Sequence, residues 1–222
     1  MNKVLVKKLI AEFIGTSFLV MVVVGSGIMA ENLSSNQLDV LLANTIATGA
    51  GLTVLIWIFI STSGAHFNPA VSFIMFLNKE LSLKEFNYFI CFQIAGGLLG
   101  VILANIMFDL DPLQISQNER GGFNIYLGEF IATFGLIITI LGVRNLNIHL
   151  VAPAVGLYIS AGYWFTSSTS FANPAVTLAR GLTDTFTGIN PEFILPFILF
   201  QIIGACVAMF LMKYLLTGEI ND

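Results

Sequence analysis

Two short stretches carry the same tripeptide: Phe67-Asn-Pro-Ala-Val-Ser72 and, later in the chain, Ala172-Asn-Pro-Ala-Val-Thr177. An asparagine followed by a proline starts a helix well, because the Asn side chain caps the first turn and proline at the first helical position loses no hydrogen bond that it needs. The apolar segments that contain these starts are short, however: His66 to Leu77 and Phe171 to Leu182. A ten-residue helix rises about 15 Å, half of a hydrocarbon core of about 30 Å. We therefore predict two re-entrant half-helices, which lipid tolerates only where their backbone is buried in protein or lines a cavity.

The rest of the chain has the composition of a membrane protein. Only 10% of its residues are charged, against about 25% in soluble domains, and the mean hydropathy is +0.88. Six stretches are long enough to span as helices of about 20 residues. They are Leu9–Ala30, Val40–Ile60, Phe86–Phe108, Phe123–Val143, Leu150–Thr169 and Phe193–Met212. The first follows three lysines but is too long for a signal peptide of the usual kind, so we interpret it as a span.

The chain also repeats itself around the two tripeptides. Ala11-Glu-Phe-Ile-Gly-Thr16 returns as Gly128-Glu-Phe-Ile-Ala-Thr133, and Phe92-Gln-Ile-Ala-Gly96 returns as Phe200-Gln-Ile-Ile-Gly204. Three spans per half is an odd number, so the second half must enter the membrane from the opposite side, which makes the halves inverted repeats. We expect one all-α membrane domain over residues 1–222, with repeats over about 8–108 and 123–216. The two half-helices then meet, N-terminus to N-terminus, near the midplane.

Basic residues set the expected orientation. With the N-terminus inside, the predicted inner segments hold seven of the nine basic residues and the outer segments hold two, Arg120 and Arg180. The positive-inside rule then places both termini in the cytoplasm. The compact loops favour a bacterial inner membrane. The net charge of −4 and the lack of a basic tract argue against a nucleic-acid partner.

The paired helix starts suggest a specific chemistry. Each helix N-terminus carries roughly half a positive charge, so two aimed at one point oppose the passage of cations, including hydronium. If the Asn68 and Asn173 oxygens cap the helices, the amide groups can donate into a pore, and a water there cannot relay a proton. No nucleophile–base pair, metal-ligand cluster or phosphate loop is present, so we expect neither an enzyme nor a cofactor.

Three ionisable residues within apolar segments need a role. Glu12 and Glu129 stand deep in two spans, one in each repeat. Such a residue is either a proton relay or an acceptor that holds the exposed N–H groups of a re-entrant loop, and the symmetrical placement favours the second. His66 lies two residues before the first motif and either lines the inner pore or anchors its loop.

The chain resembles the aquaporin, or major intrinsic protein, family over nearly its whole length. The resemblance rests on the six spans, the inverted repeats and the two motifs Asn68-Pro69-Ala70 and Asn173-Pro174-Ala175. The resemblance implies a right-handed helical bundle with one pore per subunit, commonly as a homotetramer in the bilayer. It also implies that Asn68 and Asn173 line the pore, and that Glu12 and Glu129 brace the half-helix loops.

The sequence departs from this family at the narrow filter. Most members carry arginine directly after the second motif, where this chain has Val176. Counting from the motif places the loop position of the filter at Ser170 and the fifth-helix position at Ala161. The second-helix position falls at Thr48 or Ala50. None of these residues is aromatic or charged, which predicts a wide and weakly polar filter.

Arg180 follows Val176 by one helical turn and either lines the outer vestibule or extends its charged end to the membrane interface. The aromatic residues near the outer end of the fifth span either form an interfacial belt or contribute to the filter, and the belt is favoured; they are Tyr163, Trp164 and Phe165.

The expected function is a passive channel for small uncharged solutes: glycerol, urea, undissociated metalloid acids such as arsenite, and water. A water-selective pore is one alternative. A proton-coupled transporter that uses Glu12 and Glu129 is another, and a membrane protein with a closed pore is a third.

Overall fold

The structure is a computed structural model that describes residues 2–216, so Met1 and residues 217–222 of the predicted domain lie outside the described residues. Its helices are α1 (Lys3–Leu33), α2 (Gln37–Ser63), α3 (Pro69–Leu77), α4 (Leu83–Met107), α5 (Phe123–Leu146), α6 (Val151–Phe165), α7 (Pro174–Arg180) and α8 (Ile194–Leu216), and the short 3₁₀ turns η1 (Ile148–Leu150) and η2 (Pro191–Phe193) lead into α6 and α8. Five of these helices, and α6 together with η1 (Ile148–Phe165), are long and apolar enough to cross a membrane, which makes six spans in the described residues. The predicted all-α architecture of six spans and two half-helices is confirmed.

The boundaries of the half-helices follow from proline. Both α3 and α7 begin at the proline of the motif, because the residue before a proline is disfavoured in helical conformation. The fifth predicted span, Leu150–Thr169, ends as a helix at Phe165. The residues from Thr166 to Asn173 form the loop that leads into the second motif.

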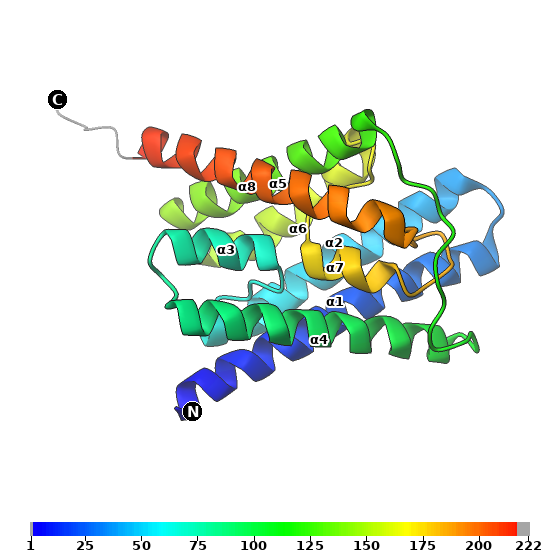
Figure 1. The fold of residues 1–222 in the computed structure, drawn as a ribbon, viewed down its shortest axis with the longest axis horizontal. Helices are drawn as coiled ribbons and strands as arrows, with labels where there is room; N and C mark the ends of the chain where they lie inside the picture. The colour runs from blue at the N-terminus through cyan, green and yellow to red at the C-terminus, as the bar shows by residue number, and fades with distance from the viewer. Residues whose placement is uncertain (1, 217–222) are drawn as a thin grey trace.

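The two halves of the chain are arranged alike. Figure 1 shows α3 and α7 in the middle of the bundle between α4 and α8, one in each half of its length, and both half-helices contact both of these long helices. In the first repeat α1 packs on α4, and in the second α5 packs on α8. The start of α1 and the last described turn of α8 lie at the same end of the bundle (Figure 1). We call this end the inner mouth and the opposite end the outer mouth, following the orientation expected from the basic residues.

Close packing of these pairs depends on glycine at equivalent positions. A Cβ on Gly96 of α4 would clash with the backbone carbonyl of Phe13 in α1, and a Cβ on Gly204 of α8 would clash with that of Phe130 in α5. Small residues at such crossings let two membrane helices approach until their backbones touch.

Gly96→Ala is therefore expected to lower the thermal unfolding temperature in detergent, since backbone atoms must move apart to admit the methyl group. Overpacking of this kind costs about 1–3 kcal/mol. Gly25→Ala is the matched control, because its Cβ would meet only the Phe108 ring, at 3.4 Å. Equal melting temperatures for the two variants would contradict the prediction.

Candidate functional site

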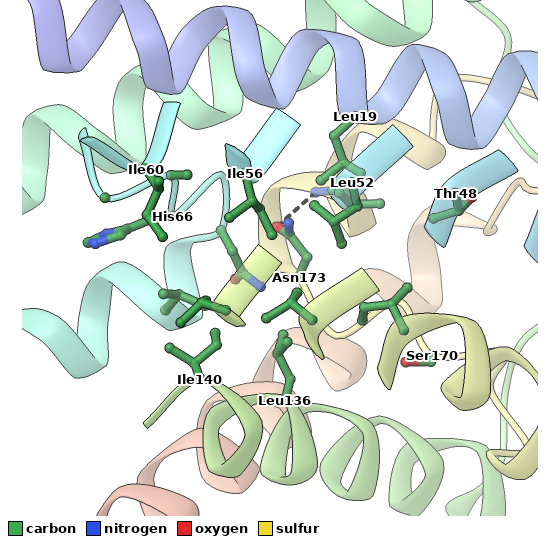
Figure 2. Close-up of a pocket in the computed structure, with 18 of the residues that line it drawn as sticks. Leu19, Thr48, Leu52, Ile56, Ile60, His66, Leu136, Ile140, Ser170 and Asn173 are labelled. Atoms are coloured by element: carbon green, nitrogen blue, oxygen red, sulfur yellow. Dashed lines mark hydrogen bonds between the residues drawn. The ribbon is translucent and has the colours of Figure 1, made fainter. Parts of the chain in front are cut away.

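One cavity of about 190 Å³ passes through the middle of the bundle and is lined by α1, α2, α3, α5, α6, α7 and the loops before the two motifs. A single water needs only about 10–15 Å³ of such space, so the cavity has room for a file of small molecules. Its walls are mostly aliphatic. Figure 2 shows Leu52, Ile56 and Leu136 around its middle, with His66 towards one end and Ser170 towards the other.

The two Asn-Pro-Ala motifs meet in this cavity. The Asn68 Oδ1 caps α3 by accepting from the Ala70 N–H at 2.9 Å, and the Asn173 Oδ1 caps α7 by accepting from the Ala175 N–H at 3.0 Å. Each amide nitrogen then crosses to the other half of the chain. Asn68 Nδ2 donates to the Ala172 carbonyl at 2.7 Å, and Asn173 Nδ2 donates to the Phe67 carbonyl at 2.8 Å. Since an amide nitrogen carries two hydrogens, one on each asparagine remains for a solute.

The loops before the motifs have an unusual backbone. Phe67 and Ala172, the residues directly before the two asparagines, have φ angles of +49° and +47°. A residue with a Cβ adopts this left-handed conformation only where its surroundings hold it there. The crossed carbonyls that accept from Asn68 and Asn173 belong to these two residues, so the conformation aims them at the opposite motif.

Two buried glutamates hold these loops. Glu12 accepts from the backbone N–H groups of His66 and Phe67 at 3.0 and 2.7 Å, and also from the Ser63 hydroxyl and the Gln93 amide. Glu129 accepts from Phe171 and Ala172 N–H, both at 2.9 Å, and from the Gln201 amide. Neither carboxylate lines the cavity. These are the contacts of a brace for the two loops.

The inner mouth is partly polar. His66 lines the cavity there, with Nδ1 at 3.0 Å from the Ser72 hydroxyl and its ring edge-on to Phe89. Arg144, at the end of α5, pairs with Glu80 at 2.8 Å across this mouth. His66 shows features of both roles left open for it, because its side chain lines the cavity and its contacts with Glu12 and Ser72 hold the loop before α3.

The outer mouth combines residues from α2, α6, α7 and the loop before α7. Thr48, Ser170, Val176 and Arg180 all line this mouth. Arg180 is 2% exposed and faces the cavity, so of its two predicted placements the structure shows the vestibule and not the membrane interface.

The first comparison with known proteins is a family model. Residues 1–147 match the sequence model of the major intrinsic proteins. The chain belongs to this family. It is accordingly a multi-pass membrane channel and not an enzyme.

Individual relatives agree with this assignment. The chain is 48% identical over 212 residues to an aquaglyceroporin, AqpS, of Rhizobium meliloti (strain 1021), covering 96% of this chain and 91% of that protein. It is 28% identical over 207 residues to nodulin-26 of Glycine max, covering 90% and 74%. The fold is similar to the crystal structure of the aquaglyceroporin from Plasmodium falciparum, with a TM-score of 0.71, 24% identity and coverage of 95% and 97%.

The fifth-helix filter position in this major intrinsic protein needs correction, and so does one of the two alternatives for the second-helix position. Ala50 and Ala161 lie on exposed faces of their helices and do not line the cavity. A helix turns about once every 3.6 residues, so the residues that face a pore recur at every third or fourth position. On α6 these are Val151, Val155, Ile159 and Tyr163. Ala161 stands midway between the last two and therefore points away.

Tyr163 corrects a further prediction. It is 4% exposed, lines the outer mouth and donates to the Thr48 hydroxyl at 3.2 Å, so it does not belong to an interfacial belt. Trp164 and Phe165 are 46% and 56% exposed, as residues that face lipid would be. The sequence holds a signal for Tyr163, because it follows Ile159 by four residues and so lies on the same face of α6 as the other residues that line the cavity. Phe171, which also lines this mouth, had no such signal because it lies in an irregular loop.

Proposed function

We propose that this channel conducts small uncharged solutes along their own gradients, glycerol, urea and undissociated metalloid acids such as arsenite among them, together with water. The observation that carries the proposal is the pair of crossed asparagines at the centre of a continuous, mostly aliphatic cavity. An aliphatic wall does not replace the hydration shell of an ion, so the desolvation free energy of a charged solute opposes its entry. A neutral solute has a much smaller desolvation free energy, and the amide groups of Asn68 and Asn173 can donate hydrogen bonds to it.

Exclusion of cations and protons is proposed to occur at the same point. The N-termini of α3 and α7 both face it, and each contributes a partial positive charge. A water that accepts from the free amide hydrogens of Asn68 and Asn173 must turn its own hydrogens away from the centre on both sides. A proton therefore cannot hop through the file.

The outer mouth favours a range of solutes over water alone. Val176 puts a small apolar side chain where most of the family has arginine, and Thr48 puts a small polar one on the facing helix. Both leave more width than a cation and a large ring would at those two positions, while Tyr163, Phe171 and Arg180 supply the rings and the cation of this mouth from other positions. Of the solutes proposed, an undissociated metalloid acid is the narrowest prediction.

The assembly is proposed from the family pattern and the sequence. Residues 1–222 act as one channel unit with repeats over about 8–108 and 123–216, and four units form a homotetramer in a bacterial inner membrane with both termini in the cytoplasm. Exposed apolar residues cover the outside of the bundle, as Ile46, Trp57 and Phe210 do, and suit contact with lipid or with another subunit.

A stopped-flow comparison tests the proposal. Proteoliposomes that contain the channel are expected to pass water, glycerol, urea and arsenite faster than empty vesicles, with no added proton flux under a pH gradient. High water flux with no solute flux would favour the water-selective alternative. Accumulation of a solute against its gradient when a pH gradient is imposed would favour the proton-coupled one.

A further inference from the structure

Arg180 is a buried cation fixed on two sides. It lies in the last turn of α7, and its Nε donates to the Thr187 carbonyl. The guanidinium carbon stacks 3.3 Å from the centroid of the Phe171 ring. One edge and one face of the guanidinium are therefore held by protein, which fixes its direction at the outer mouth.

The other edge of this guanidinium is unused. Neither terminal nitrogen of Arg180 makes a hydrogen bond to any of residues 2–216. Neither is among the buried side-chain atoms that are sealed without a partner. Both terminal nitrogens therefore keep some exposed surface and have no hydrogen-bond partner. Because the Arg180 side chain lines the cavity, we take this surface to face the cavity. They present the planar fork of N–H donors that matches two oxygens of one ligand.

A second guanidinium approaches the same aromatic ring. The Arg120 side chain comes from the loop between α4 and α5, and its guanidinium carbon lies 5.1 Å from the Phe171 centroid. It is held by the carbonyls of Gly188 and Phe186 at 2.7 and 2.9 Å. Two positive charges are therefore gathered around one ring at the outer mouth.

No carboxylate of the described residues forms an ion pair with either arginine. Among residues 2–216, neither Arg120 nor Arg180 has a carboxylate oxygen within 4.0 Å. The buried Glu129 carboxylate acts on both guanidinium groups, but its oxygens accept from the N–H groups of Phe171 and Ala172 and from the Gln201 amide. One carboxylate against two cations leaves an excess of positive charge, and an incompletely balanced charge in a partly buried site favours binding of an anion. The carboxylates of the outer loops are exposed, do not line the cavity, and act through screening solvent; they are Glu31, Asp39, Asp109, Asp111, Glu119, Asp184 and Glu192.

Ser170 adds a donor without a partner. It lines the same mouth, is 3% exposed, and its Oγ makes no hydrogen bond in the described part of the chain. Buried hydroxyl groups are rarely left unpaired. This Oγ is closed off from the cavity and lies against Gly162 of α6, so the side chain must turn about its χ1 bond before an acceptor bound in the mouth can satisfy it.

We infer that the outer mouth is a binding site for a small oxyanion, held by the Arg180 fork and the Ser170 hydroxyl and attracted by the Arg120 charge. Because this site lies in the path of the solute, a bound oxyanion blocks the channel to neutral solutes. The block rests on the proposed function, whereas the binding does not.

Inorganic phosphate is the probe for the block. Glycerol flux into proteoliposomes is measured with phosphate on both sides, at constant ionic strength maintained with chloride. Flux through the wild-type channel is expected to fall by more than half as phosphate replaces chloride. In Arg180→Met the half-inhibiting concentration should rise about tenfold or more, the effect of losing charge-assisted hydrogen bonds. Ser170→Ala and Arg120→Met should raise it less.

Binding is measured separately from flux by thermal unfolding in detergent. A ligand that binds only the folded state raises the unfolding temperature with its concentration. Phosphate should therefore stabilise the wild-type protein but not Arg180→Met. Arg144→Met is the matched control, since that arginine lines the opposite mouth and is already paired with Glu80; it should keep the stabilisation by phosphate.

The outcomes separate the two proposals. Phosphate-dependent stabilisation of the wild type that Arg180→Met loses supports the site, even if no vesicle passes glycerol and the proposed function fails. No stabilisation of the wild type, or equal stabilisation of Arg180→Met, overturns the site whatever the flux. Stabilisation without any block of a conducting wild-type channel overturns the placement of the anion in the solute path.

Discussion

Glu129→Leu is expected to remove most of the stability of the folded channel. The substitution leaves the N–H groups of Phe171 and Ala172 without an acceptor, in a loop where Ala172 holds a left-handed backbone. Each unsatisfied buried donor costs about 1–3 kcal/mol, so the pair costs roughly 2–6 kcal/mol. That is a large part of the total stability of about 5–15 kcal/mol that native proteins have. The unfolding temperature in detergent and the monodisperse fraction after solubilisation measure the loss.

Two further variants make this result interpretable. Glu192→Leu changes an exposed glutamate and is expected to stay within about 0.5 kcal/mol of the wild type. Glu12→Leu removes the equivalent acceptor of the first repeat and should be as damaging as Glu129→Leu. A Glu129→Leu protein that melts like the wild type would show that the loop finds other acceptors, and the bracing role would have to be abandoned.

Val176→Arg is expected to have the largest effect on selectivity. Val176 is 4% exposed and lines the outer mouth one helical turn before Arg180. A long side chain there fills the width that a small residue leaves open, and its N–H donors suit a single file of water. Glycerol flux should fall about tenfold or more, which corresponds to a barrier only about 1.4 kcal/mol higher. Water flux should change much less.

Val176→Met separates bulk from charge in the same stopped-flow comparison. Methionine is long and unbranched but uncharged, so it should reduce glycerol flux without adding donors for water. A ratio of water to glycerol flux that rises more in Val176→Arg than in Val176→Met supports the role of charge. Unchanged glycerol flux in Val176→Arg would mean that the narrow point of the channel lies elsewhere.

The fold could be predicted from the sequence because its signals are local. Span length, helix starts at Asn68-Pro69 and Asn173-Pro174, and the repeated glutamate are properties of short segments. The inverted arrangement then follows from counting spans, since an odd number per repeat reverses the second half. The contact of Glu12 and Glu129 with the loops could be anticipated, because each repeat has one buried carboxylate and one re-entrant loop whose backbone N–H groups need an acceptor.

The site was predicted only as far as register was known. Position relative to a motif placed Ser170 and Val176 correctly at the outer mouth. The second-helix position stayed open between Thr48 and Ala50, and Ala161 was misplaced, because no motif fixes the rotation of the second and fifth spans. That rotation is set by how whole helices pack, and a shift of two residues turns a side chain from the pore to the lipid.

The sequence by itself determined six spans, two capped half-helices meeting at their N-termini, and the absence of arginine after the second motif. Only the tertiary structure decided that the outer mouth still has a cation. Arg180 reaches it from the next turn of α7, and its direction is set by Phe171 and the Thr187 carbonyl. These contacts join a half-helix to the loops on either side of it, and no local pattern specifies where an irregular loop brings a ring or a carbonyl. The same dependence on distant loops places Arg120 beside Phe171, which turns two isolated basic residues into one positively charged mouth.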